Sequence, residues 1–219
     1  ARQGLLAPEK SGPVDPESEL LLLRELFKSH VYARRPRSAH AIAKKMVRLG
    51  ALPEVAHADL GRASASLGWF VRASQAYRLA ARFAPAHRRA LHWGACAAAL
   101  HHAGRNDEAL AALERAVRWS TTTRPLHRAH AALVRLDGGQ TVEDLRTLTE
   151  ELAEAKCGEG YGRYVLGLLA DARGDRVAAV GYLREFVTRN HGDLLKAATL
   201  TGELARARRV LRARRVGSG

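Results

Sequence analysis

The sequence predicts an all-α protein in which a helical hairpin is repeated about four to five times. Three observations support this prediction. Apolar residues make up 47% of the 219 residues but aromatic residues only 5%, and abundant alanine favours helices that pack closely on other helices. The chain shows neither the apolar–polar alternation of strands nor a strand–helix rhythm. Finally, glycines that follow apolar runs recur at a nearly constant interval.

The recurring glycines are Gly68, Gly104, Gly139 and Gly174, at spacings of 36, 35 and 35 residues. Each follows an alanine-rich or leucine-rich run, as a turn at the end of a helix does. After three of these turns, a small, a large and then a small or apolar residue follow at intervals of four and three, which places them on one helix face. These residues are Ala73, Tyr77 and Ala80, then Ala109, Leu113 and Ala116, then Ala179, Leu183 and Phe186. Each unit is therefore predicted to be helix, tight turn, helix.

These units resemble the tetratricopeptide repeat (TPR), whose unit is about 34 residues long. The signature positions hold Leu60-Gly61, Gly68, Ala73, Tyr77, Ala80 and Pro85 in residues 54–89, Trp93, Gly104, Ala109, Leu113 and Ala116 in 90–124, and Leu166-Gly167, Gly174, Ala179, Leu183 and Phe186 in 160–192. Residues 125–159 match at Gly139 and Leu148, whereas Asp144 and Glu151 replace small residues. The resemblance implies a right-handed α-solenoid.

The two ends of the chain extend this pattern. A further hairpin is expected over 15–53, with Asp15 as N-cap, Pro16 at the first helical position and Gly50 ending the second helix. Residues 193–216 are expected to form one long, basic capping helix, because the last unit of a solenoid has no neighbour to cover it. Residues 1–14 and 217–219 are expected to be tails.

The amino-acid composition restricts the partners and the cellular location that we expect for the protein. The net charge is +14, which predicts attraction to an acidic protein, nucleic acid or anionic lipid, although a genome-wide preference for arginine would produce the same bias. Two cysteines do not form a disulfide framework. No apolar run approaches the roughly 18 residues of a membrane span. We expect a cytoplasmic protein, or an envelope-associated one if a signal segment preceded Ala1.

No pattern of catalytic residues stands out, so we expect neither an enzyme nor a cofactor. The chain lacks a phosphate loop, a dinucleotide fingerprint and a nucleophile elbow. His127 and His130, and likewise His92 and Cys96, have spacings that place two metal ligands together. No third ligand is apparent, and Cys96 falls at a core position, so no metal site is predicted.

The resemblance implies that the first helix of each hairpin lines a concave wall, which in this family commonly holds a peptide or helix of a partner protein. By register, this wall carries Arg62, Leu91, His101, His102, Leu126, Leu133, Leu136, Tyr161, Tyr164, Leu168 and Asp171. The set is mostly apolar and suits a hydrophobic or amphipathic segment. The alternative is that several of these residues pack under neighbouring helices. A chaperone-binding subtype is not expected, because its Lys/Asn clamp positions hold Ala58, Arg62, Gly94 and Ala98.

The basic residues predict a second kind of surface. They are Arg34, Arg35, Arg37, Lys44, Lys45, Arg78, Arg82, Arg88, Arg89, Arg208, Arg209, Arg212 and Arg215. Two hypotheses follow. The protein is a non-catalytic scaffold or adaptor that binds a protein segment in its groove, as a subunit of a larger assembly. Alternatively, it is a basic accessory subunit that docks to nucleic acid or an anionic membrane. A regulatory domain of a larger enzyme is a weaker third hypothesis.

Overall fold

A computed structural model describes residues 15–216, with side chains described up to residue 214. The expected tails, 1–14 and 217–219, lie outside the described residues. The described part is all-α. Its helices are α1 (Pro16–Tyr32), α2 (Pro36–Leu49), α3 (Pro53–Ser66), α4 (Phe70–Phe83), α5 (Ala86–His102), α6 (Asn106–Trp119), α7 (Arg124–Asp137), α8 (Leu145–Glu154), the short 3-10 helix η1 (Lys156–Gly158), α9 (Tyr161–Ala172), α10 (Arg176–His191), α11 (Leu194–Thr199) and α12 (Thr201–Val216).

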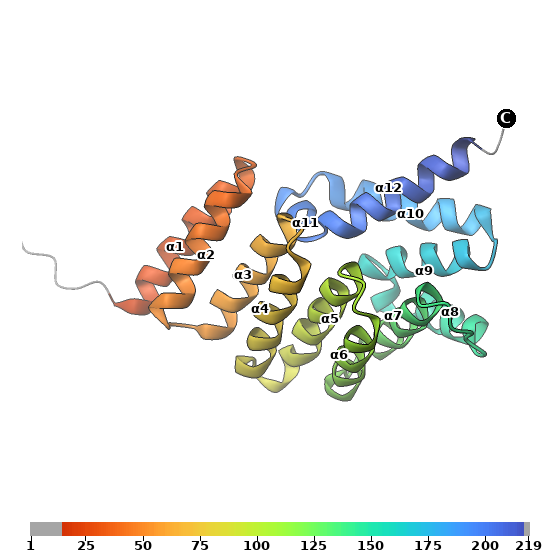
Figure 1. The fold of residues 1–219 in the computed structure, drawn as a ribbon, viewed down its shortest axis with the longest axis horizontal. Coiled ribbons are helices and arrows are strands. Elements are labelled where there is room, and N and C mark those ends of the chain that lie inside the picture. Colours follow the sequence, from red (N-terminus) through yellow and green to blue (C-terminus); the bar gives the residue numbers. More distant parts are fainter. Residues whose placement is uncertain (1–14, 217–219) are drawn as a thin grey trace, which may run out of the picture.

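The helices stack as successive antiparallel pairs. Each odd-numbered helix from α1 to α9 packs on the helix that follows it, and neighbouring pairs meet through α2 and α3, α4 and α5, and α6 and α7. Figure 1 shows these pairs side by side along the long axis of the molecule. The predicted α-solenoid of helical hairpins is confirmed.

Helix ends follow the signals in the sequence. The Asp15 carboxylate accepts a hydrogen bond of 3.0 Å from the backbone N–H of Ser18, and Pro16 begins α1, as predicted. Glycines in the left-handed region end or connect helices: Gly50 has φ +76°, and the four recurring glycines have φ between +72° and +80°. Residues other than glycine rarely adopt this backbone conformation, which explains why glycine recurs at these turns.

The small and large residues on the second helices form the contacts between helices. Tyr77 and Leu183 are almost fully buried. Each packs against a glycine of the preceding helix: a Cβ on Gly61 would lie 2.6 Å from the Tyr77 ring, and a Cβ on Gly167 would lie 2.6 Å from Leu183. The Leu-Gly of the repeat signature therefore serves close packing between the two helices of a hairpin.

The fourth unit is irregular. Its second helix, α8, has 10 residues and begins only after Asp144, whereas α4 and α6 each have 14. Leu148 and Leu152 of α8 remain buried, and η1 then connects α8 to α9. The polar residues at small-residue positions thus coincide with a shortened helix that keeps its leucine contacts.

The C-terminal segment corrects one prediction. Residues 193–216 do not form a single helix, because the chain bends at Leu200 between α11 and α12. Thr199, Thr201 and Gly202 are weak helix formers at this point. The bend lets α11 contact α1 and α3, while α12 returns along α10 and also touches α3 and α9. Figure 1 shows α11 beside α3 and α12 running beside α10. The segment therefore reaches back across the solenoid as well as covering its last hairpin.

Candidate partner-binding pocket

A pocket lies where the C-terminal helices approach the first helices of the repeats. Its walls come from α5, the α6–α7 connection, the start of α7, the start of α9, and α11 with α12. Phe70 and Tyr77 of α4 complete one side. The space measures about 360 Å³, near the lower end of the roughly 300–1,000 Å³ typical of small-molecule pockets. The pocket exists because α11 and α12 stand over α5 and the start of α9 without filling the space between them.

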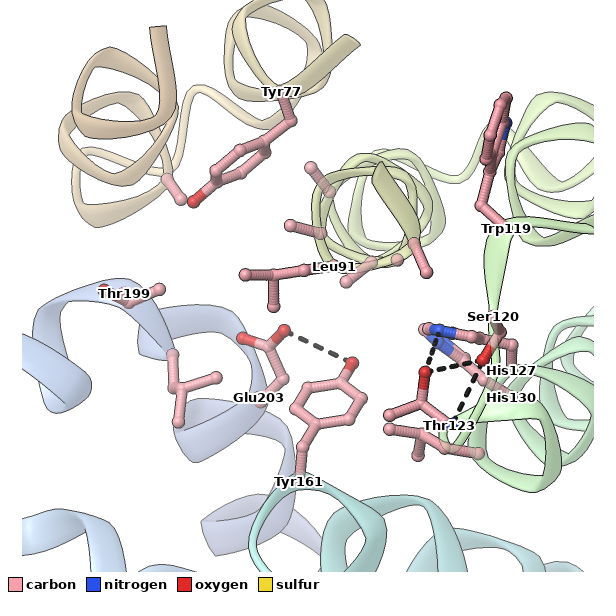
Figure 2. Close-up of a pocket in the computed structure, with 18 of the residues that line it drawn as sticks. Tyr77, Leu91, Trp119, Ser120, Thr123, His127, His130, Tyr161, Thr199 and Glu203 are labelled. Atoms are coloured by element: carbon pink, nitrogen blue, oxygen red, sulfur yellow. Dashed lines mark hydrogen bonds between the residues drawn. The ribbon is translucent and has the colours of Figure 1, made fainter. Parts of the chain in front are cut away.

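The lining of the pocket is largely apolar, with a few polar groups directed inward. Leu91, on α5, is 60% exposed, whereas the adjacent Ala90 and His92 are buried. Figure 2 shows Tyr77, Leu91, Tyr161 and Glu203 surrounding the same space. Other large apolar side chains of the protein are exposed as well, but Leu91 and Trp119 are exposed at this pocket. Ligand sites are concave and mostly apolar with a few polar groups, and this pocket has that character.

One corner of the pocket is held rigid by a small polar network. The Ser120 and Thr123 hydroxyls lie 2.8 Å apart, and the Ser120 hydroxyl accepts from the Thr123 backbone N–H at 3.1 Å. The Thr123 hydroxyl also lies 3.2 Å from Nε2 of His127. Burial lowers the pKa of His127 to about 4, so this ring is neutral at pH 7. The network fixes the α6–α7 connection with internal hydrogen bonds, as Figure 2 shows.

A second polar network ties α12 to α5 and α7. Nε2 of His101 lies 2.7 Å from Oδ2 of Asp137 and must donate, because a carboxylate can only accept. Arg206 of α12 donates to Oδ1 of the same carboxylate at 2.8 Å, and Nδ1 of His101 lies 3.2 Å from His130. Burial opposes ionisation of Asp137, but the hydrogen bonds from His101 and Arg206 outweigh it and hold its pKa well below the usual range. The network therefore anchors the C-terminal helix.

The residues predicted to line the groove fall into three groups. Leu91, His102, Leu126 and Tyr161 line the pocket. The side chains of Leu133, Tyr164 and Leu168 are at most 4% exposed, so the expectation that these residues present an open groove does not fit the structure. They belong to the core shared by α7, α9, α10 and α12, which is the alternative stated above. A third group, Arg62, His101, Leu136 and Asp171, lies near the wall but contacts other parts of the protein.

The third group has specific partners. Arg62 pairs with Asp59 of its own helix, and Asp59 also pairs with Arg24 of α1 at 2.9 Å. Arg214 of α12 donates to Asp171 at 2.7 Å. Leu136 is partly buried against the core around α9. The carboxylates of Asp59, Asp137 and Asp171 are therefore already paired with arginines. Two of these arginines, Arg206 and Arg214, lie on α12.

The candidate metal pairs have structural contacts instead. Nε2 of His92 lies 2.7 Å from Glu54, and His127 contacts Thr123 as described above. Cys96 is fully buried, and this burial raises the pKa of its thiol to about 11. Within residues 15–216, no three histidine, cysteine or carboxylate side chains gather as a metal site would require.

Comparison with known proteins identifies the architecture. No protein family matches the chain, and no curated protein does. Among solved structures, a MamA RS-1 ArsTM double mutant is 17% identical, with a TM-score of 0.54 over 82% of this chain and 99% of that one. Two structures of a Podosopora anserina putative kinesin light chain with nearly identical TPR-like repeats are 18% and 15% identical. Their TM-scores are 0.57 and 0.54 over 86% of this chain and 99% and 98% of theirs. The fold is TPR-like.

Most of the predicted basic residues are exposed on or beside the second helices of the first two hairpins, or on α12. The second helices α2 and α4 contain no carboxylate, and their exposed residues include Arg37, Lys44, Lys45, Arg78 and Arg82, with Arg34 and Arg35 in the preceding turn. Arg78 lies 3.8 Å from Glu108. The side chain of Arg215 lies outside the described residues, and Arg208, Arg209 and Arg212 are exposed on α12.

Two of the predicted basic residues serve internal contacts. Arg88 and Arg89 lie on the first helix α5, and neither belongs to the exposed face of α2 and α4. Arg88 pairs with Glu54 at 3.0 Å. Arg89 stacks over the Trp119 ring at 4.4 Å and donates to the Ala84 carbonyl. These arginines are therefore better explained by packing than by an external partner.

Several pocket residues were not predicted from the sequence. Phe70, Trp119, Thr123 and Glu203 line the pocket of this TPR-like protein, but the register of a single repeat does not mark them. Glu203 comes from the C-terminal segment, and its approach to α5 depends on the bend at Leu200. One available signal was compositional: Glu203 is the only acidic residue in the basic stretch that follows Asp193.

Proposed function

We propose that this protein is a non-catalytic scaffold that binds a segment of a partner protein at the pocket between α5 and the C-terminal helices. The observation that carries the proposal is the exposed side chain of Leu91 beside an apolar space of about 360 Å³. Solenoid repeats offer preformed surfaces for extended or helical segments. An apolar side chain of the partner would contact Leu91 and remove both from water.

The α11–α12 segment restricts where that partner segment lies. The Arg206–Asp137 and Arg214–Asp171 contacts hold α12 against the wall formed by α7 and α9. Leu204 and Ala207 of α12 are buried in the same core. The part of the wall that remains accessible is centred on α5 and the α6–α7 connection. The partner segment is therefore expected to run along α5.

Site-directed photo-crosslinking with matched surface variants tests this proposal. A photoreactive amino acid at Leu91 should capture a discrete protein from the native lysate at high salt, whereas the same amino acid at Val177 should not. Val177 is 87% exposed on α10 and lies outside the pocket. Leu91→Asp should abolish capture of that protein in a pull-down, and Val177→Asp should leave it unchanged. Equal capture at both positions would refute the proposed site.

A second candidate function rests on the face formed by α2 and α4. The His40 ring of α2 lies 5.0 Å from the ring of Trp69, at the start of α4, so the exposed cations of the two helices lie near one another. Arg72 also lies 5.1 Å from the centre of the Trp69 ring. This face suits docking to a phosphate-rich surface. Binding to DNA or to anionic vesicles should fall steeply with salt and should be lost in a Lys44→Glu, Lys45→Glu variant.

A further inference from the structure

Glu203 is an acidic residue in an unusual place. It is 5% exposed, and it lines the mostly apolar pocket. It enters from the first turn of α12 and faces Leu91 and Tyr161 (Figure 2). A carboxylate removed from water is costly unless charge or hydrogen bonds compensate it, so its partners decide whether the residue is explained by the fold.

The partners of Glu203 are few and distant. Its Oε1 lies 3.5 Å from Nε2 of His102 and 3.5 Å from the Tyr161 hydroxyl. Both distances are at the long limit for a hydrogen bond. Among the described residues, no hydrogen-bond or ion-pair partner contacts Oε2. Arg206, one turn further along α12, is engaged by Asp137. The protein thus leaves one carboxylate oxygen of Glu203 without a matching cation.

Tyr161 and His102, the two neighbours of Glu203, are themselves fixed by the surrounding residues. Burial and the nearby Glu203 raise the pKa of Tyr161 well above its usual range, so Tyr161 keeps its proton. The His102 ring stacks on Phe70, with 5.1 Å between the ring centres, and it packs against Gly202, where an added Cβ would lie 3.0 Å from the ring. These contacts hold His102 in place, and they leave the pocket side of Glu203 free.

From this arrangement we propose that the pocket binds a small apolar molecule that ends in a primary ammonium group. The ammonium would donate to Oε2 of Glu203. Its apolar part would occupy the space beside Leu91, Phe70 and Leu126. The aromatic lining also suits a cation, because ring faces attract positive charge. This inference goes beyond the proposed function, since it concerns a small ligand and requires no partner protein.

Three probes of one shape test the charge requirement. Phenylbutylamine, phenylbutanol and phenylbutyrate share an apolar stem and differ in their terminal group. Isothermal titration calorimetry at pH 7 should show the amine binding roughly tenfold or more tightly than the alcohol, as expected of a charge-assisted hydrogen bond. The carboxylate should bind most weakly. Equal affinities of amine and alcohol, or binding by none of the three, would overturn the proposal.

Variants and spectra locate the interaction. Glu203→Gln keeps the size of the side chain and should bring the amine and alcohol affinities within about twofold. Glu143→Gln removes an exposed carboxylate outside the pocket and should leave the preference intact. In the unaltered protein, the amine should shift the NMR signals of the Trp119 and Tyr161 rings, which tests the site even if Glu203→Gln folds poorly. Shifts confined to other residues would contradict the assignment. These titrations use purified protein and a small amine, whereas crosslinking at Leu91 detects a partner protein, so failure of one proposal can be distinguished from failure of the other.

Discussion

Replacing Asp137 by asparagine should weaken the attachment of α12 to the solenoid. The Asp137 carboxylate receives hydrogen bonds from His101 of α5 and Arg206 of α12, at 2.7 and 2.8 Å. Asparagine has nearly the same size, but it removes the negative charge and replaces one of the two accepting oxygens by an NH2 donor. The variant therefore disrupts this polar network, while the apolar packing of Leu204 and Ala207 stays as it is.

The size of the effect follows from these contacts. A buried hydrogen bond to a charged group contributes about 1.5–3 kcal/mol. The side chains of Asp137 and Arg206 are 30% and 27% exposed, so solvent screening reduces this contribution. We expect Asp137→Asn to lower the free energy of unfolding by about 2 kcal/mol at pH 7.

The pH dependence provides a more specific test. The pKa of Asp137 in the folded protein lies below its usual value of about 3.9 in an unfolded chain. Its contribution is therefore fully present above about pH 5 and shrinks as pH falls below about 4, because the unfolded chain then takes up the proton. Urea unfolding of both proteins at pH 7 and pH 3 measures this. A stability difference that is below about 0.5 kcal/mol at pH 7, or the same at both pH values, would refute the reasoning.

Two further predictions concern the packing of the helices. Leu133→Ala should lower the free energy of unfolding by about 2–5 kcal/mol, because Leu133 is 1% exposed; a thermal unfolding curve unchanged from wild type would show that it does not lie in the core. Gly167→Ala should lower the free energy of unfolding by about 1–3 kcal/mol, because the added Cβ would lie 2.6 Å from Leu183. Gly181→Ala, on α10, should leave the free energy of unfolding unchanged or raise it by up to about 1 kcal/mol, because a Cβ there would meet nothing within 4 Å. Equal effects of the two alanines in denaturant titrations would contradict the close approach of α9 and α10.

The helical units could be predicted because their signals are local. A glycine such as Gly104 marks a turn through its own backbone conformation, with φ +72°. Residues such as Ala109 and Leu113 reveal a buried face through their spacing alone. Each signal lies within one repeat, and its recurrence in the next repeats strengthens the prediction. This information does not depend on how distant parts of the chain meet.

The pocket could not be predicted because it depends on contacts between distant segments. Tyr164 stands at a wall position of its repeat, yet it is 1% exposed because α10 and α12 pack over α9. Glu203 approaches Tyr161 and His102 only because the chain bends at Leu200 and turns back. Repeat register describes the wall of an isolated solenoid, and it contains no information about a segment that folds back onto that wall.

The pocket depends on the contact between α5 and α12. Both the proposed partner segment and the proposed amine require that pocket. Nuclear Overhauser effects between the His102 ring and the α-protons of Gly202 measure this contact most directly. The structure predicts strong effects, because a Cβ on Gly202 would lie 3.0 Å from the His102 ring. Assigned signals without any effect between them would show that the C-terminal helices do not close over α5, and would contradict the account.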